Sequence, residues 1–475
     1  MSERIKVDLC VIGAGSGGLS VAAGASQMGA RTVLVERHRM GGDCLNTGCV
    51  PSKALLAAAH AARTVREAEK FGISVGEPQV DMAAVHDHVH GVIAAIAPHD
   101  SVERFEGLGV RVIRGEGRFV GPRELTAGDV TIRARRFVIA TGSRPLIPRV
   151  PGLDQVPFFT NETLFDNRAA LPHLLIIGGG PIGLEMAQAH RRLGAAVTVV
   201  DQGRILPRDD PELTAVVADR LTAEGVTLRQ GVTVTRAERD GAGIAVVVGN
   251  GRGESEPLRG SHLLVAAGRR PNLETLNLEA AEVDFTSRGI TVDARLRTRN
   301  RRIFAIGDVA GPYLFTHAAG YQAGIVLRNA LFRIPTKVDY RALPWTTYTD
   351  PELAHVGLAE AAARAAGEKV TVLRKSFAEN DRARAEGATE GLIKVVVGQR
   401  GRILGASIVG SQAGELLQPW ILAMQQGLGI GAMATVIAPY PTRGEIGKAV
   451  AGAWYTPTLF APRTQRLVRF LSLFG

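Results

Sequence analysis

Residues 7–18 read VDLCVIGAGSGG, and the apolar run TVLVE follows at residues 32–36. This pattern predicts a buried strand, a glycine-rich turn, an alanine-rich helix and a second strand that ends in an acid. A strand, turn, helix and strand in this order are typical of a parallel α/β sheet that binds a dinucleotide. We therefore expect the chain to begin with a Rossmann-like unit.

The turn supplies three glycines and the second strand supplies a carboxylate. Gly13, Gly15 and Gly18 permit the tight turn and the close approach of the backbone to a pyrophosphate at the helix N-terminus. Glu36 is placed to bind the hydroxyl groups of a ribose. A glycine triplet alone is weak evidence, but between a strand and a helix, with the acid at this distance, it is strong.

A second copy of the pattern starts at Leu174, with glycines at Gly178, Gly180 and Gly183 and with Asp201 as the acid. The first glycine and the acid are 23 positions apart in both copies. The chain is thus predicted to bind two dinucleotides. A carboxylate at residue 201 would repel a 2′-phosphate, which favours NADH over NADPH as the second nucleotide.

The stretch at residues 41–53 reads GGDCLNTGCVPSK and contains two of the three cysteines, Cys44 and Cys49. Pro51 fits the first turn of a helix, whose partial positive charge favours thiolates. A structural disulfide and a metal site are the alternatives. A redox-active dithiol is the favoured interpretation, and its position after the first fingerprint makes that fingerprint the flavin site. Cys10 lies in the first buried strand, and we expect it to be inert.

Composition narrows the classes of function. The chain has 475 residues, 45% of them hydrophobic, which suits three folded domains. The net charge is +10, but basic residues are scattered and aromatic residues make up 5%, which argues against nucleic acid as a partner. No apolar run is long enough to span a membrane and no signal peptide is apparent, so we expect a cytoplasmic protein.

Later segments suggest further elements. Residues 303–308 read IFAIGD, a buried strand whose last residue, Asp308, is placed to meet a cofactor hydroxyl. His86 and His90 share a helix face, for which a polar surface is a better interpretation than a metal site. After Pro344 the strands and helices indicate an α+β domain. Residues 463–474 form a basic and apolar helix candidate that either docks on the protein or lies on a membrane surface, with docking favoured.

With these pieces assembled, the chain resembles the pyridine nucleotide-disulfide oxidoreductases that include dihydrolipoamide dehydrogenase, glutathione reductase and mercuric reductase. The resemblance covers nearly the full length and rests on the cysteine stretch, both fingerprints, ATGS at 140–143, AIGD at 305–308 and GATEGLIK at 387–394. It implies an FAD-binding domain in two parts (1–150 and 273–340), an NAD(P)H-binding domain (151–272) and a C-terminal domain (341–475) that forms a homodimer and completes the partner's active site.

The resemblance also implies roles for individual residues. Cys49 would lie against the flavin as the charge-transfer thiol while Cys44 exchanges with substrate, and Lys53 would stand near flavin N5 and pair with Glu185. Asp308 would hold the ribityl chain, and His317 and Ala318 would begin a helix that points at the flavin pyrimidine. Further cofactor contacts are implied for Gly42, Thr141, Gly142 and Gly268.

The sequence departs from the family pattern at residues 440–445, which read YPTRGE where disulfide-reducing members carry His-Pro-Thr followed by a glutamate. Tyr440 and Glu445 therefore occupy the positions of the acid/base pair, and no histidine follows His355. A tyrosine is a poor base at neutral pH but donates a proton or hydrogen bond. Tyrosine here resembles mercuric reductases, although the C-terminal cysteine pair and the N-terminal metal-binding domain of that group are missing.

Three functions remain as hypotheses. The first is an FAD enzyme that passes electrons from NADH through Cys44 and Cys49 to a disulfide or a thiol-bound metal ion. The second is a reductase of quinones or other diffusible acceptors in which the dithiol is secondary. The third is a redox-sensing flavoprotein on a membrane partner. The small-molecule acceptor itself has no distinguishing motif.

Overall fold

The computed structural model describes residues 3–249, 251 and 253–474. The chain divides into two compact units. The first comprises residues 1–202 and 229–338, and the second comprises residues 203–228 and 339–475. Within the described ranges, no helix combines the length and the apolar character that crossing a membrane requires.

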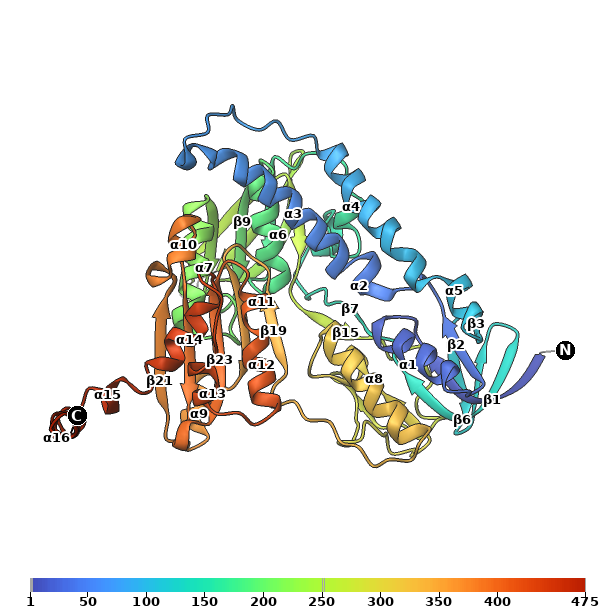
Figure 1. Cartoon of the computed structure of the whole chain (residues 1–475). Coiled ribbons are helices and arrows are strands. Elements are labelled where there is room, and N and C mark those ends of the chain that lie inside the picture. The colour runs from blue at the N-terminus through green and yellow to red at the C-terminus, as the bar shows by residue number, and fades with distance from the viewer. Residues whose placement is uncertain (1–2, 250, 252, 475) are drawn as a thin grey trace. The chain divides into compact units, whose positions relative to one another are not determined.

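The first unit is built on a sheet of seven strands (Figure 1). Its strands are β1 (Glu3–Ile12), β2 (Thr32–Glu36), β3 (Val110–Arg114), β4 (Gly117–Gly121), β5 (Glu124–Ala127), β6 (Val130–Ile139) and β18 (Ile303–Ala305). β1 lies between β2 and β6 and pairs in parallel with both. β18 pairs in parallel with β6, so the strand that precedes Asp308 joins the sheet that the first fingerprint begins.

Helices cover this sheet and carry the cysteines. They are α1 (Ser16–Gln27), α2 (Gly42–Asn46), α3 (Cys49–Arg66), α4 (Met82–Ile96), α5 (Val102–Gly107) and α8 (Thr316–Ala330). The apolar residues of α1 and α8 pack with those of β1 and β2 in one core on one face of the sheet. A second core, which includes Phe119 and Phe137, packs against the other face. The carboxyl ends of the parallel strands, where ligands bind in such sheets, are thereby left to the glycine-rich turns.

The second fingerprint forms a smaller parallel sheet in the same unit. Its elements are β8 (His173–Ile177), α6 (Pro181–Arg192), β9 (Ala196–Asp201) and β14 (His262–Val265), and β8 pairs in parallel with β9 and β14. An antiparallel meander of β11 (Thr233–Asp240), β12 (Gly243–Gly249) and β13 (Ser255–Gly260) accompanies it. Two short pairs complete the unit: β7 (Ser143–Pro145) with β15 (Arg269–Pro271), and β16 (Phe285–Thr286) with β17 (Gly289–Ile290). β10 (Val226–Gln230) spans the division between the units.

The second unit is an antiparallel sheet packed with helices. The strand order is β19-β20-β23-β22-β21. The strands are β19 (Pro344–Thr347), β20 (Glu352–Gly357), β21 (Thr371–Ser376), β22 (Leu392–Val397) and β23 (Ile403–Gly410). The helices are α7 (Pro211–Ala223), α9 (Glu360–Ala365), α10 (Asp381–Ala385), α11 (Ala413–Leu416), α12 (Gln418–Gln425), α13 (Ile430–Ala434), α14 (Glu445–Gly452), α15 (Thr456–Leu459) and α16 (Pro462–Leu471). Trp420 is the largest side chain that is fully buried in this core.

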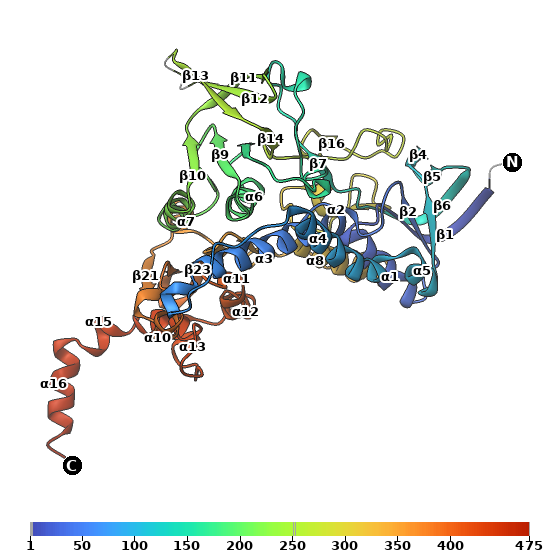
Figure 2. The same cartoon turned by 90° about the horizontal axis from the view of Figure 1, so that it is seen from above.

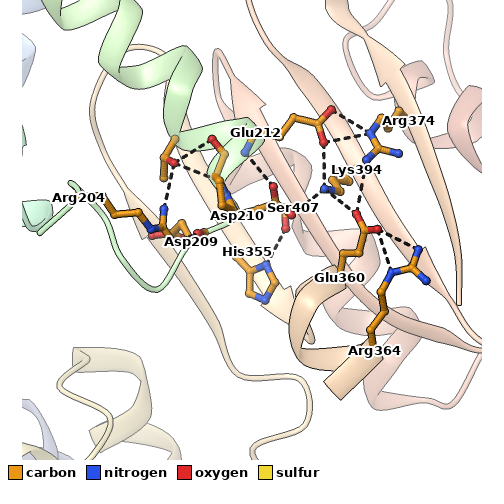
Figure 3. A network of polar contacts seen from close by, with 12 residues as sticks. Arg204, Asp209, Asp210, Glu212, His355, Glu360, Arg364, Arg374, Lys394 and Ser407 are labelled. Atoms are coloured by element: carbon orange, nitrogen blue, oxygen red, sulfur yellow. Dashed lines mark hydrogen bonds and ion pairs between the residues drawn. The ribbon is translucent and has the colours of Figure 1, made fainter. Parts of the chain in front are cut away.

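A buried lysine fastens α7 to this sheet (Figure 3). The Lys394 Nζ atom of β22 lies 2.8 Å from Asp210, 2.9 Å from Glu212 and 3.0 Å from Glu360. The side chains of Lys394 and Asp210 are only 6% and 7% exposed. Asp210 also caps α7, because its carboxylate accepts a hydrogen bond from the Glu212 N–H. One ammonium group therefore contacts three carboxylates from two segments of the second unit.

The predicted fold class is confirmed: two nucleotide-binding regions with parallel strands and a C-terminal α+β domain are present. The predicted helix after the cysteines is α3, which begins at Cys49. The helix predicted to begin near His317 is α8, and its first residue is Thr316.

Candidate functional site

The cysteine segment packs directly on the first glycine-rich turn. Gly41 and Gly42 both adopt left-handed backbone conformations, with φ of 86° and 59°. A Cβ atom on Gly42 would lie 2.7 Å from the Cα atom of Gly15, and the Gly41 N–H donates to the Ala14 carbonyl oxygen at 2.9 Å. Only a glycine fits residue 42 without displacing this turn. The position of both cysteines is thus set against the predicted flavin fingerprint.

The two thiols lie where helices begin and end. Cys44 is in the short helix α2, and Cys49 is the first residue of α3, whose N-terminus favours negative charge. The Cys49 Sγ atom lies 3.5 Å from the hydroxyl of Thr316, the first residue of α8. All three cysteines are free thiols in this structure, and Cys10 is buried. Burial raises the pKa of the Cys10 thiol, which agrees with its predicted inertness.

The surroundings make Cys49 the thiolate of the pair. The hydrogen bond from Cys44, helped by that from Thr316 and by the charge of Lys53, lowers the pKa of Cys49 to about 6 against the opposing effect of burial. The same contact with Cys49, together with burial, raises the pKa of Cys44. The two thiols titrate as a pair, in which the negative charge is favoured on Cys49.

Lys53 and Glu185 form the ion pair that the resemblance implied. The Lys53 Nζ atom lies 2.8 Å from the Glu185 carboxylate, which is nearly buried on α6. Lys53 is one helical turn after Cys49 on α3. The pair therefore joins the cysteine helix to the helix of the second fingerprint and places a cation near the thiolate.

The first fingerprint has the shape of a phosphate cradle. A Cβ atom on Gly18 would collide with the carbonyl oxygen of Gly13, and one on Gly15 would meet no atom within 4 Å. Gly13 and Gly18 are thus needed for the turn itself, while Gly15 faces open space at the start of α1. The Glu36 carboxylate accepts a hydrogen bond of 2.6 Å from the Ala14 N–H. These features fit the pyrophosphate and ribose of a dinucleotide, so the chain can hold FAD here.

The second fingerprint repeats this geometry. A Cβ atom on Gly183 would collide with the carbonyl oxygen of Gly178, and one on Gly180 would meet no atom within 4 Å. The Asp201 carboxylate accepts a hydrogen bond of 2.7 Å from the Gly179 N–H. The two predicted nucleotide sites therefore have the same local construction.

The turns after the closing strands lie together. The Thr141 hydroxyl donates to the Asn272 carbonyl oxygen at 2.9 Å, and β7 pairs with β15 directly after Gly142 and Gly268. Both glycines have positive φ, 67° and 125°. His317 and Ala318 follow Thr316 in the first turn of α8, and Ala318 is buried. The structure thus brings the predicted contacts around β7 together.

Asp308 belongs to a polar cluster that sequence reasoning missed in part. Its carboxylate accepts a hydrogen bond of 2.5 Å from the Ser143 hydroxyl. Arg269, whose side chain is 12% exposed, lies 3.6 Å from Asp308 and 3.2 Å from Asp43, the residue before Cys44. Burial raises the pKa of Asp308 although Ser143 and Arg269 oppose this effect. Arg269 therefore connects the cysteine segment to the predicted ribityl-binding acid.

Tyr440 and Glu445 lie in the second unit, and each is hydrogen-bonded to a different neighbour. The Tyr440 side chain is 72% exposed, and its hydroxyl donates to the Asp381 carboxylate at 3.1 Å. This hydrogen bond raises the pKa of Tyr440. The Glu445 carboxylate accepts instead from the Thr442 N–H at 3.3 Å. Asp381 is thus the acid that holds the tyrosine hydroxyl, a contact that no motif in the sequence predicts.

The histidines of α4 do not form a metal centre. The rings of His86 and His90 stack with their centroids 4.1 Å apart, and His90 is hydrogen-bonded to the Phe165 carbonyl oxygen. Among the residues that the structure describes, no group of three or more histidine, cysteine or acidic side chains is arranged to hold a metal ion. The polar interpretation of this helix face agrees with these contacts.

Two family models match the chain. The model described as pyridine nucleotide-disulphide oxidoreductase matches residues 7–323, and the dimerisation domain of the same family matches residues 343–451. The first match spans the cysteines and both fingerprints, and the second spans the sheet of the second unit.

Individual relatives agree. A dihydrolipoyl dehydrogenase from Thermus scotoductus is 38% identical over 92% of this chain and 95% of its own length. A mercuric reductase from Streptomyces lividans is 36% identical over 94% of this chain and 95% of its own length. Among solved structures, the Cu(II) complex of the HOCl-induced flavoprotein disulfide reductase RclA from Escherichia coli superposes with a TM-score of 0.85, at 26% identity, over 94% of this chain and 99% of that chain.

These matches establish the general class of the protein. The protein is an oxidoreductase that binds FAD, uses NAD(P)H and forms a homodimer through its C-terminal domain. Relatives at this level of identity include both mercuric reductases and dihydrolipoyl dehydrogenases. The chain belongs to the pyridine nucleotide-disulphide oxidoreductase family.

Proposed function

We propose that the protein uses NADH to reduce a thiophilic metal ion held by Cys44 and Cys49, in the manner of a mercuric reductase. The observation that carries this proposal is the unequal pair of thiols: the pKa of Cys49 is lowered to about 6, while that of Cys44 is raised. FAD, when bound, supplies the two-electron relay between the nicotinamide and the thiols.

The number of protons on the reduced cysteine pair follows from the reduction step. Reduction of a Cys44-Cys49 disulfide by two electrons and one proton gives the Cys44 thiol and the Cys49 thiolate. Lys53, held by Glu185 at 2.8 Å, and the Thr316 hydroxyl stabilise the negative sulfur. The reduced pair therefore stores the two electrons as one thiol and one thiolate.

The next step has different requirements for a metal-ion acceptor and for a disulfide acceptor. To attack a disulfide, Cys44 must first lose its proton to a base, and a neutral tyrosine with a raised pKa is unsuited to accept it. A soft metal ion needs no such base, because coordination itself displaces the thiol proton. Ion binding to both sulfurs, electron transfer to the ion and re-formation of the disulfide then complete the cycle. Relatives named for mercuric reduction and for a Cu(II) complex support this class of acceptor.

We further propose NADH as the preferred donor. The Asp201 carboxylate is fixed at the end of β9 by the Gly179 N–H. A fixed negative charge at this position binds the two hydroxyls of an adenosine ribose and repels a 2′-phosphate. Parallel reductions with NADH and NADPH compare the two donors, and faster flavin reduction by NADPH would contradict this preference.

An anaerobic titration of the holoenzyme with NADH tests the role of the dithiol. We expect uptake of one electron pair for the flavin and a second for the cysteine pair, with a long-wavelength absorption band of the thiolate and flavin at the midpoint. Bleaching of the flavin after a single pair, without this band, would make the dithiol secondary and quinones the first acceptors to assay.

Substituting Tyr440 tests its part in acceptor choice. Tyr440→His is expected to increase the turnover of lipoamide by about tenfold to a hundredfold, because a histidine accepts the Cys44 proton near neutral pH. The measurement is the rate of NADH oxidation with lipoamide as acceptor. Tyr440→Phe serves as the matched control that adds no base. If the histidine variant gains no more than the phenylalanine variant, Tyr440 does not occupy the acid/base position.

A further inference from the structure

The chain continues beyond the region that it shares with the family. The dimerisation model matches up to residue 451, whereas helices α15 and α16 lie after it. Figure 2 shows α16 as a separate ten-residue helix near the C-terminus. We call residues 462–474 the C-terminal segment. The redox site already described uses none of these residues.

One side of the C-terminal segment is apolar and exposed. Five large apolar residues that group on one side are between 53% and 74% exposed: Leu467, Val468, Phe470, Leu471 and Phe474. Leu473, which is 77% exposed, follows the end of α16 on the side of the arginines. Arg466 and Arg469, three positions apart on α16, flank this apolar side, and Ser472 follows at the end of the helix. Docking on the protein is the interpretation favoured from sequence, and the described residues of the same protomer leave this apolar side exposed.

The charge of the C-terminal segment indicates which kind of ligand its exposed side can bind. Glu445 is the last acidic residue of the sequence, so the C-terminal segment carries Arg463, Arg466 and Arg469 without any acidic side chain. Among the described residues, its side-chain hydrogen bonds come from Thr464, Gln465 and Ser472 and go to backbone carbonyl oxygens of residues 458, 460 and 469, so they leave the guanidinium groups out. Aliphatic and phenyl groups beside arginines match the acyl chains and phosphates of an anionic lipid surface.

Two other binding partners, a second copy of the segment and a nucleic acid, match this surface less well. A second copy of the segment would bring arginines together without acidic partners. A nucleic acid would satisfy the arginines but would leave five large apolar side chains in water. Only a surface that is both anionic and apolar satisfies both sides of the helix.

We propose that the C-terminal segment holds the enzyme on the surface of a membrane that contains anionic phospholipids. The helix lies in the plane of the interface, with Phe470, Leu471 and Phe474 among the acyl chains and the arginines at the phosphates. This proposal is independent of the electron acceptor, because it concerns residues outside the redox site.

Vesicle co-sedimentation of the full-length FAD-loaded protein tests the proposal. We expect binding to vesicles of phosphatidylglycerol mixed with phosphatidylcholine and little binding to phosphatidylcholine alone. Arg463, Arg466 and Arg469 changed together to glutamine should weaken binding to the anionic vesicles roughly a hundredfold, since each basic residue contributes about 1 kcal/mol at an anionic surface. Added salt should weaken the wild-type interaction in the same direction.

A matched control tests whether vesicle binding depends on the C-terminal segment or on the positive charge of the chain as a whole. Arg31, Arg259 and Arg341 are exposed arginines of the two units. Their joint change to glutamine removes the same charge and should leave vesicle binding unaltered. Phe470→Ser with Phe474→Ser should also abolish binding while NADH oxidation in solution persists. Equal losses in the control and test variants, absence of binding to either vesicle, or a loss of dimer in place of vesicle binding would each overturn the proposal.

Discussion

Replacing Cys49 with serine is expected to lower NADH-dependent reduction of Hg(II) by at least about a thousandfold, because a nucleophilic sulfur that defines the reaction is removed. A serine hydroxyl in the same place stays protonated at neutral pH, and it neither coordinates a soft ion well nor forms a disulfide. The measurement is the steady-state rate of NADH oxidation with Hg(II) as acceptor. Flavin content and dimer state should be unchanged.

Two further variants make this result specific. Cys44→Ser should cause a comparable loss with Hg(II), because both sulfurs are needed to hold and reduce the ion. Cys10→Ser is the control, because Cys10 is buried in β1 and takes no part in the proposed reaction. Full Hg(II) activity in Cys49→Ser would show that electrons leave the flavin without the dithiol. Quinone reduction that survives in Cys49→Ser would mark a second route.

Replacing Lys394 with methionine is expected to lower the free energy of unfolding of the second unit by about 3 to 5 kcal/mol. Methionine preserves the length of the side chain but removes the ammonium group beside the buried Asp210 carboxylate, while Glu212 and Glu360 keep their contacts with Arg374. Urea unfolding at fixed protein concentration, followed by tryptophan fluorescence, measures the difference, because all three tryptophans belong to the second unit. Lys375→Met removes an exposed ion pair with Glu379 and should cost less than about 1 kcal/mol.

The lysine cluster also predicts a pH window for this difference. Arg374 and Lys394 lower the pKa of Glu212, and Lys394 lowers that of Glu360, from 4.5. Burial opposes the charge of Lys394, but its carboxylate partners raise its pKa above 10.5. The stabilisation is therefore complete between about pH 4.5 and 10.5, and it is lost as the carboxylates protonate below or the lysine deprotonates above. A difference between wild type and Lys394→Met that persists at pH 3 would contradict this account.

Local patterns carried most of the prediction from sequence. The two fingerprints were predictable because each is a continuous stretch in which glycines and an acid act on neighbouring backbone groups. The N-terminal position of Cys49 on its helix was predictable for the same reason, from Pro51. The ion pair of Lys53 with Glu185 was predicted from the family resemblance. No local motif could predict it, since the two residues are 132 positions apart.

The site residues that were not predicted from the sequence make contacts between segments far apart in the chain. Thr316 meets Cys49 across 267 positions, and Arg269 meets Asp43 through the pairing of two three-residue strands. Asp381 meets Tyr440 across 59 positions in a loop without periodicity. Each contact depends on how sheets and loops assemble, and single-residue chemistry gives no sign of it. The predicted domain boundaries and the catalytic roles of the site residues stay predictions.

The attachment of α7 to the second unit constrains the order in which the chain can fold during synthesis. Asp210 emerges from the ribosome 184 residues before Lys394, its buried partner. Until β22 exists, the acidic start of α7 must remain hydrated, because burying carboxylates without a cation is costly. The second unit thus cannot close while only the N-terminal half of the protein has been made. We expect a nascent chain that stops before residue 394 to keep residues 203–228 accessible to proteases, even where the flavin-binding sheet has already formed.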